Sequence, residues 1–169
     1  MSFGSDRVWG FQLIGAMRAY RIVRPAFAAT ALSGEGARLY GGRWNLEGLP
    51  CVYAAGSRAL AALELLVHTA PESLPLRFEL IELEVPDDLL ESRLSPPPRW
   101  DAMPASDVSK RFGDRWLRGN YRAALKVCSA VVPEEWNLLL NPRHSDFKQV
   151  KVVSQREFRF DSRMRRAIS

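Results

Sequence analysis

The amino-acid sequence predicts a single α+β (mixed α/β) domain with a central mixed or antiparallel sheet flanked by helices. Strand-like segments outnumber helical ones, and the two best helical segments lie between them. Hydrophobic residues make up 47% of the 169 residues, which is enough for a chain of this size to bury a core. Disorder of the whole chain is therefore excluded.

The N-terminal part is expected to contain a leader, one strand and one long loop. Residues 1–17 have little patterning and are assigned to a leader, with Met17 as a candidate alternative start, so the domain is expected to span residues 18–169. Residues 20–23 alternate as a strand does. Residues 30–50 are polar and contain five glycines, which permit close backbone approach, so this segment is expected to be a loop that folds around something.

A helix is predicted directly after a short apolar strand at residues 52–55. Ser57 is a good N-cap residue, and the apolar residues of the segment 58–68 recur at helical spacing. Glu64 is the exception on this apolar helix. A carboxylate in such a place is costly unless it is paired or faces a cavity.

The next part of the chain predicts a strand and then a second helix. Residues 76–85 alternate between apolar and polar side chains, but the parity changes once, which indicates a β-bulge. Apolar residues spaced by four predict a helix over residues 106–117, and Gly119 is its expected stop.

The C-terminal part predicts three strands. Residues 125–132 form a continuous apolar run bounded by Pro133, which is typical of a central strand buried on both faces. Residues 147–153 and 157–160 are predicted to close the chain as two further strands.

Cysteine and histidine usage predicts neither a disulfide nor a metal site. Cys51 and Cys128 both lie in apolar runs, so both are expected to be buried free thiols. His68 and His144 are the only histidines, too few to favour zinc. No apolar run approaches the roughly 18 to 20 residues that span a bilayer, and no signal segment is apparent, so a cytoplasmic protein without membrane contact is expected.

The net charge of +5 resides entirely in the C-terminal segment. Residues after Pro142 include eight basic and three acidic ones, so the first 142 residues sum to zero. A basic segment suggests a nucleic-acid partner, which would make this a binding protein and not an enzyme. Its basic residues alternate with apolar ones, however, which favours a solvated strand face that could meet a partner or steer an anionic substrate. The interleaved apolar residues are Val150, Val152, Phe158 and Phe160.

Arg43 is a candidate anion-binding residue. It follows paired glycines in the segment 34–45, and a guanidinium beside glycines offers forked donors together with accessible backbone N–H groups. A phosphate-bearing ligand fits this pattern. The alternative is a glycine-rich loop in which Arg43 pairs with a local acid such as Glu47.

Glu64 and Ser129 are further candidates, each with a structural alternative. Glu64 could pair with a buried arginine such as Arg21, or it could stabilise positive charge that develops on a substrate, as glycosidic cleavage requires. Ser129 lies in an apolar run, where its hydroxyl could simply satisfy a neighbouring carbonyl. No Gly-x-Ser-x-Gly elbow surrounds it, so a hydrolase nucleophile is not supported.

Taken in order, these motifs resemble the RES-domain toxins, a family named after an Arg, a Glu and a Ser. The resemblance runs from Tyr20 to about Arg163. The family often has proline where this chain has Cys128 and Ser145. The motifs that carry the resemblance are Tyr20-Arg21, Gly34-Glu-Gly-Ala-Arg, Gly41-Gly-Arg-Trp-Asn, Pro50-Cys-Val-Tyr53, Leu63-Glu64, Cys128-Ser129, Pro133-Glu-Glu-Trp-Asn and Asn141-Pro-Arg-His-Ser-Asp-Phe.

The resemblance implies a fold similar to the diphtheria-toxin-like ADP-ribosyltransferases and an activity that destroys NAD in the bacterial cytoplasm. NAD would be a substrate, with no separate cofactor and with water, inorganic phosphate or a protein side chain as acceptor. Arg43, Tyr53, Glu64 and Ser129 would form the pocket, with Arg21 as a further anion-binding candidate. Whether Arg21 contacts the substrate or only pairs with Glu64 stays open.

The resemblance also implies a protein partner. Toxins of this family are paired with an antitoxin that carries an Xre-type helix-turn-helix domain. A hetero-oligomer is therefore expected, in which the antitoxin blocks the pocket and makes any contact with DNA.

Overall fold

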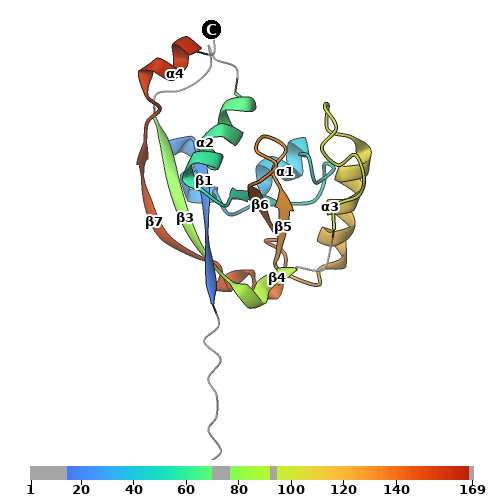
Figure 1. Ribbon diagram of the computed structural model, residues 1–169. Coiled ribbons are helices and arrows are strands. Elements are labelled where there is room, and N and C mark those ends of the chain that lie inside the picture. Colours follow the sequence, from blue (N-terminus) through green and yellow to red (C-terminus); the bar gives the residue numbers. More distant parts are fainter. Residues whose placement is uncertain (1–14, 70–76, 92–94, 168–169) are drawn as a thin grey trace, which may run out of the picture.

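The computed structural model describes residues 15–69, 77–91 and 95–167, which form a curled seven-stranded sheet with helices around it (Figure 1). The strand order is β4-β5-β6-β2-β1-β3-β7, and all neighbours are antiparallel except β4 and β5. This confirms the predicted α+β class with a mixed sheet. The strands are β1 (Ala16–Val23), β2 (Val52–Ala55), β3 (Phe78–Pro86), β4 (Leu90–Glu91), β5 (Ala124–Cys128), β6 (Trp136–Leu140) and β7 (Lys151–Phe158).

The described residues also form four α-helices and three short 3-10 helices, of which α4 follows the last strand and the others lie between strands. The α-helices are α1 (Glu35–Tyr40), α2 (Arg58–Val67), α3 (Asp107–Gly119) and α4 (Ser162–Ala167), and the 3-10 helices are η1 (Pro25–Thr30), η3 (Asp87–Leu89) and η4 (Ser145–Gln149). None of the helices in the described part of the chain has the length and apolar character that a bilayer crossing requires.

The predicted helix after residue 57 is confirmed as α2. The Ser57 hydroxyl accepts a hydrogen bond from the Leu60 N–H at 3.0 Å, as expected of an N-cap. Leu60 and Ala61 are buried against β1 and β3, where they meet Tyr20. The cap and this apolar contact fix where α2 begins and which of its faces meets the sheet.

The strand predicted from residue 20 is longer than expected. β1 begins at Ala16, which pairs with Pro86 on β3, so Ala16 and Met17 of the presumed leader already belong to the sheet. Residues 1–14 of that segment lie outside the described residues.

The parity change in β3 has a different cause from the predicted bulge. Phe78 and Leu80 pack into the cluster under α2, whereas Ile81, Leu83 and Val85 pack into the cluster on the opposite face. The strand therefore switches the face that it buries between residues 80 and 81, without an inserted residue there. Leu76, where the prediction began, lies outside the described residues.

An irregularity does occur slightly further along the same pairing. Glu82 pairs with Ser154 and Leu83 with Val152, so the extra residue, Val153, lies on β7.

The predicted central strand at residues 125–132 is wrong in its extent and its burial. β5 ends at Cys128. Lys126 and Cys128 are exposed, so the face that they share with the buried Ala124 is only partly covered. The neighbouring interior strand, β6, was not predicted from the sequence. Leu138, Leu139 and Leu140 of β6 are fully buried between β5 and β2.

The loop predicted at residues 30–50 is interrupted by α1 and folds closely on α3. A Cβ atom on Gly113 would overlap the backbone carbonyl of Trp44, so this glycine permits α3 to pack directly on the loop. The residue that ends α3 in the left-handed conformation is Asn120, at φ 52°, and not Gly119.

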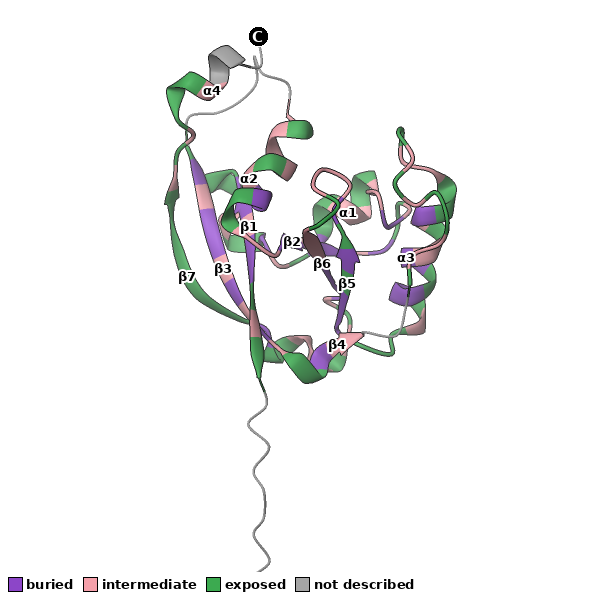
Figure 2. Ribbon diagram, viewed as in Figure 1, coloured by how far each residue is buried: buried purple, intermediate pink, exposed green. Residues whose placement is uncertain are grey.

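The C-terminal strands predicted at residues 147–153 and 157–160 are wrong in their bounds. Residues 147–149 belong to η4, and a single continuous strand, β7, runs from Lys151 to Phe158. β7 is exposed over most of its length at the edge of the sheet, as Figure 2 shows, which agrees with a solvated strand face. Part of the local positive charge is neutralised there, because Arg77 and Arg159 pair with Glu157.

The two cysteines differ in accessibility, which gives a test of the fold. Cys51 is buried, and burial raises the pKa of its thiol, whereas Cys128 is exposed, contrary to the expectation of two buried thiols. We expect one thiol per native chain to react with a soluble disulfide reagent and two after denaturation. The Cys128→Ser variant should show no reactive thiol until it is unfolded. Rapid reaction of both thiols in the native protein would contradict the packing around Cys51.

Candidate active site

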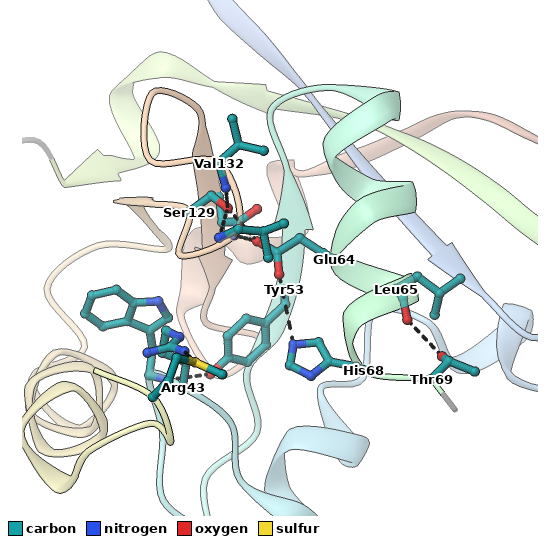
Figure 3. A network of polar contacts seen from close by, with 12 residues as sticks. Arg43, Tyr53, Glu64, Leu65, His68, Thr69, Ser129 and Val132 are labelled. Atoms are coloured by element: carbon teal, nitrogen blue, oxygen red, sulfur yellow. Dashed lines mark hydrogen bonds and ion pairs between the residues drawn. The ribbon is translucent and has the colours of Figure 1, made fainter. Parts of the chain in front are cut away.

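A cavity of about 420 Å³ opens between β1, β2, β6, α2 and the glycine-rich segment around α1. Arg21, Arg43, Tyr53 and Glu64, four of the five residues singled out from the sequence, line it. The fifth, Ser129, is fully buried and contacts Glu64 directly (Figure 3). The sheet and α2 thus bring together residues that are far apart in the chain.

Glu64 is held through one of its two carboxylate oxygens. Its Oε1 atom accepts hydrogen bonds from Ser129 Oγ at 2.8 Å and from Asn137 Nδ2 at 2.5 Å. Its Oε2 atom lies 4.0 Å from His68 Nε2, and the Glu64 side chain is 24% exposed. Within the described part of the chain no arginine pairs with Glu64: its two hydrogen-bond donors are neutral groups, and His68 lies within ion-pair distance.

The Ser129 hydroxyl has its hydrogen-bonding capacity fully used. It accepts from the backbone N–H groups of Val131 at 3.0 Å and Val132 at 3.1 Å. Because a hydroxyl has two lone pairs and one proton, these contacts leave the proton for Glu64. The partner of Ser129 is therefore a carboxylate on another element and not a neighbouring carbonyl.

Tyr53 presents its ring to the cavity and its hydroxyl to the glycine-rich loop. The hydroxyl donates to Asn45 Oδ1 at 2.6 Å and accepts from the Trp44 N–H at 3.1 Å. Burial raises the pKa of this phenol, which stays protonated. A Cβ atom on Gly42 would lie 2.6 Å from the Tyr53 hydroxyl, so a glycine is required for the loop to approach.

Arg21 is a buried cation with a donor to spare. Its Nη1 atom donates to the Tyr53 carbonyl at 2.7 Å, while its Nε atom is buried without a partner among the described residues. Burial lowers the pKa of this guanidinium, although not enough to neutralise an arginine. An unsatisfied buried N–H is costly, and an anion in the cavity would relieve that cost.

Arg43 is anchored by a loop that is distant in the sequence. Its Nη1 atom donates to the carbonyls of Trp100 at 3.1 Å and Ala102 at 3.0 Å, and its Nη2 atom contacts Met103 Sδ at 2.8 Å. Trp44 next to it stacks on Trp100, with ring centroids 5.4 Å apart. Arg43 is thus held by backbone carbonyls and not by Glu47, and no carboxylate among the described residues pairs with it.

Two lining residues were missed by the sequence analysis. Asn137 lies on β6 and His68 at the end of α2, and both line the cavity with Glu64. Asn137 could have been found, because it closes the motif Pro133-Glu-Glu-Trp-Asn. In the described residues no three His, Cys, Asp or Glu side chains gather as a metal site would require.

A cavity that holds two arginines and a hydrogen-bonded carboxylate is typical of a site for an anionic small molecule. The family model for the RES domain matches residues 18–161, and the chain therefore belongs to the RES domain family. This confirms the resemblance found from the motifs.

The chain aligns with curated relatives over most of their length. The chain is 48% identical over 143 residues to "Prs ADP-ribosylating toxin" of Sphingobium sp. (strain YBL2), which covers 82% of this chain and 89% of that protein. It is 39% identical over 155 residues to "Toxin Res" of Photorhabdus laumondii, covering 89% and 99%. It is also 40% identical over 152 residues to "Toxin Res" of Yersinia enterocolitica, covering 88% and 100%.

The buried hydroxyl of Ser129 should contribute measurably to stability. Ser129→Ala removes one donor to Glu64 and takes the hydroxyl acceptor from the N–H groups of two half-buried residues, Val131 and Val132. We expect the free energy of unfolding in urea to fall by about 1–3 kcal/mol. Ser154→Ala, on the exposed strand β7, is the matched control and should leave it unchanged. Equal stability of the two variants would show that the Ser129 contacts are not formed.

Proposed function

We propose that this chain is an NAD-consuming toxin that cleaves the N-glycosidic bond between nicotinamide and ribose. The observation that carries the proposal is the carboxylate of Glu64, which is fixed through Oε1 in the same cavity as Arg21 and Arg43. The names of the relatives, two called "Toxin Res" and one called "Prs ADP-ribosylating toxin", support a toxin that uses NAD.

One carboxylate suffices for this reaction. The nicotinamide of NAD is already cationic and leaves as a neutral molecule, so no general acid is needed, unlike in most glycosidases. The C1′–N bond breaks with its electron pair going to the nicotinamide nitrogen, and the ribose acquires oxocarbenium character. Glu64 stabilises that positive charge electrostatically. When water is the acceptor, its oxygen bonds to C1′ and its proton is released to solvent.

The other lining residues bind and orient the substrate. The unpartnered Nε of Arg21 suits the pyrophosphate, and Arg43 adds positive charge to the lining of the same cavity. The ring of Tyr53 offers an apolar wall for nicotinamide or ribose. Ser129 acts through Glu64, because its proton and both lone pairs are already used.

Two candidate functions share this binding site for NAD and differ in the group that accepts the ADP-ribose. Water or inorganic phosphate would make the protein an NAD glycohydrolase or phosphorylase, yielding ADP-ribose or its 1-phosphate. The name of the relative at 48% identity favours the second candidate, transfer of ADP-ribose to a protein side chain. To distinguish the three acceptors, labelled NAD is incubated with the protein, with and without phosphate and with a lysate. Label in ADP-ribose indicates water, label in its 1-phosphate indicates phosphate, and label on protein indicates a side chain.

A paired antitoxin belongs to this proposal. We expect an Xre-type antitoxin to form a hetero-oligomer with the chain in the cytoplasm, to cover the cavity and to make the contacts with DNA. Three arginines of the basic C-terminal segment are already engaged: Arg159 and Arg163 pair with Glu157 and Asp161, and Arg156 donates to a backbone carbonyl, which disfavours direct DNA binding by this chain.

Replacement of Glu64 tests the mechanism directly. Glu64→Gln keeps the shape and the acceptor oxygen but removes the charge, so we expect the turnover number for NAD to fall by about 10²- to 10³-fold. Glu47→Gln, the same change at an exposed position of the glycine-rich loop, is the control and should retain the wild-type rate. Near-normal turnover by Glu64→Gln would remove the carboxylate from the mechanism.

A further inference from the structure

The hydrogen bond between Asn137 and Glu64 has a use beyond stability. We propose that Asn137 is a positioning residue, which together with Ser129 holds Oε1 of Glu64 and thereby leaves Oε2 for the substrate. The inference rests on the proposed function, because it concerns how the same carboxylate is presented.

The backbone around Asn137 is fixed on both sides. Asn137 lies on the interior strand β6, where it pairs with Ala55 of β2 and with Val127 of β5. A residue between two ladders has little freedom to move along or out of the sheet. The amide of Asn137 is therefore delivered to the cavity from a rigid part of the fold.

The helix that carries Glu64 is tied to the same segment of chain. Ser57, the N-cap of α2, donates from its hydroxyl to Glu135 Oε2 at 2.7 Å, and the Gly56 N–H donates to the Trp136 carbonyl at 2.9 Å. A Cβ atom on Gly56 would lie 2.6 Å from the Trp136 ring, so the two segments are in direct contact. These contacts set the start of α2 relative to β6 and hence the distance between Glu64 and Asn137.

The chemistry of the pair determines which way the amide faces. An ionised carboxylate only accepts hydrogen bonds, so the NH₂ group of Asn137 has to point to Glu64. Both neutral donors, from Ser129 and Asn137, converge on Oε1, and no hydrogen bond among the described residues reaches Oε2. Ion pairing with Arg21 or Arg43, which line the same cavity, would redirect the carboxylate, and the two neutral donors prevent this without neutralising its charge.

Asn137→Asp is the decisive variant, because it keeps the shape and replaces a donor by a second carboxylate. Two carboxylates this close cannot both be ionised, so they compete for a proton while His68, Arg21 and Arg43 surround the cavity. We expect its turnover number for NAD at pH 8 to fall by about 10- to 100-fold with a smaller change in KM, and to recover partly as the pH is lowered. Asn137→Leu should lose turnover at every pH. Gln155→Glu, the same change from amide to carboxylate on the exposed strand β7, should match the wild type.

A second readout does not depend on activity. In Asn137→Asp the folded protein binds a proton more tightly than the unfolded chain does, so its stability should be retained at low pH and lost as the pH rises. The melting temperature of this variant should therefore fall between pH 5 and pH 8 relative to that of Gln155→Glu. The double variant Glu64→Gln/Asn137→Asp lacks the second carboxylate at this site, so the difference should disappear.

The two readouts separate the ways in which the inference can fail. Wild-type turnover together with a pH-independent melting temperature in Asn137→Asp would overturn it, because Asn137 would then not contact Glu64. A pH-dependent melting temperature with no NAD consumption by the wild-type protein would instead overturn the proposed function and, with it, the assigned use of the contact. If Asn137→Asp loses turnover only at high pH and its melting temperature also falls there, the result supports both the role of Asn137 and the proposed function.

Discussion

The fold around the cavity depends on one requirement: the carboxylate of Glu64, on the apolar helix α2, must receive hydrogen bonds. Glu64 lies on a helix that packs on the sheet, and a carboxylate there is tolerated only where donors and a cavity receive it. Ser129 and Asn137 supply the donors from the segment that ends β5 and enters β6. The ties from Ser57 to Glu135 and from Gly56 to Trp136 keep helix and segment together, so the contacts that order this part of the fold also define the cavity.

The positive charge of the site is organised separately from that of the whole chain. The net charge of +5 comes from the residues after Pro142, most of which lie on or beside the exposed edge strand β7. Arg21 and Arg43 belong to the part of the chain that sums to zero. Both are held by backbone carbonyls and not by carboxylates, so their charges remain available to a ligand. Bulk charge is thus a poor guide to this cavity, whereas the local setting of each arginine is informative.

Local sequence signals identified the features that depend on neighbouring residues. The Ser57 cap, the helix α2 and the anomaly of Glu64 follow from spacing and polarity within a few residues, and the structure confirms the cap and the helix. Features that depend on distant partners could not be found in this way. The contact of Arg43 with Trp100 and Ala102, and that of Ser129 with Glu64, join segments that only the folded chain brings together. The strand β6 was missed because its apolar run is short, and the burial on both faces of β3 imitated a bulge.

Our central proposal is that the protein consumes NAD in the cavity around Glu64. The most direct test is the cellular NAD concentration after the chain is expressed in bacteria without a partner, compared with expression of Glu64→Gln to the same protein level. The account predicts that NAD falls sharply with the wild-type chain and stays near the uninduced level with the variant. An NAD concentration that is unchanged by a folded wild-type chain would contradict it.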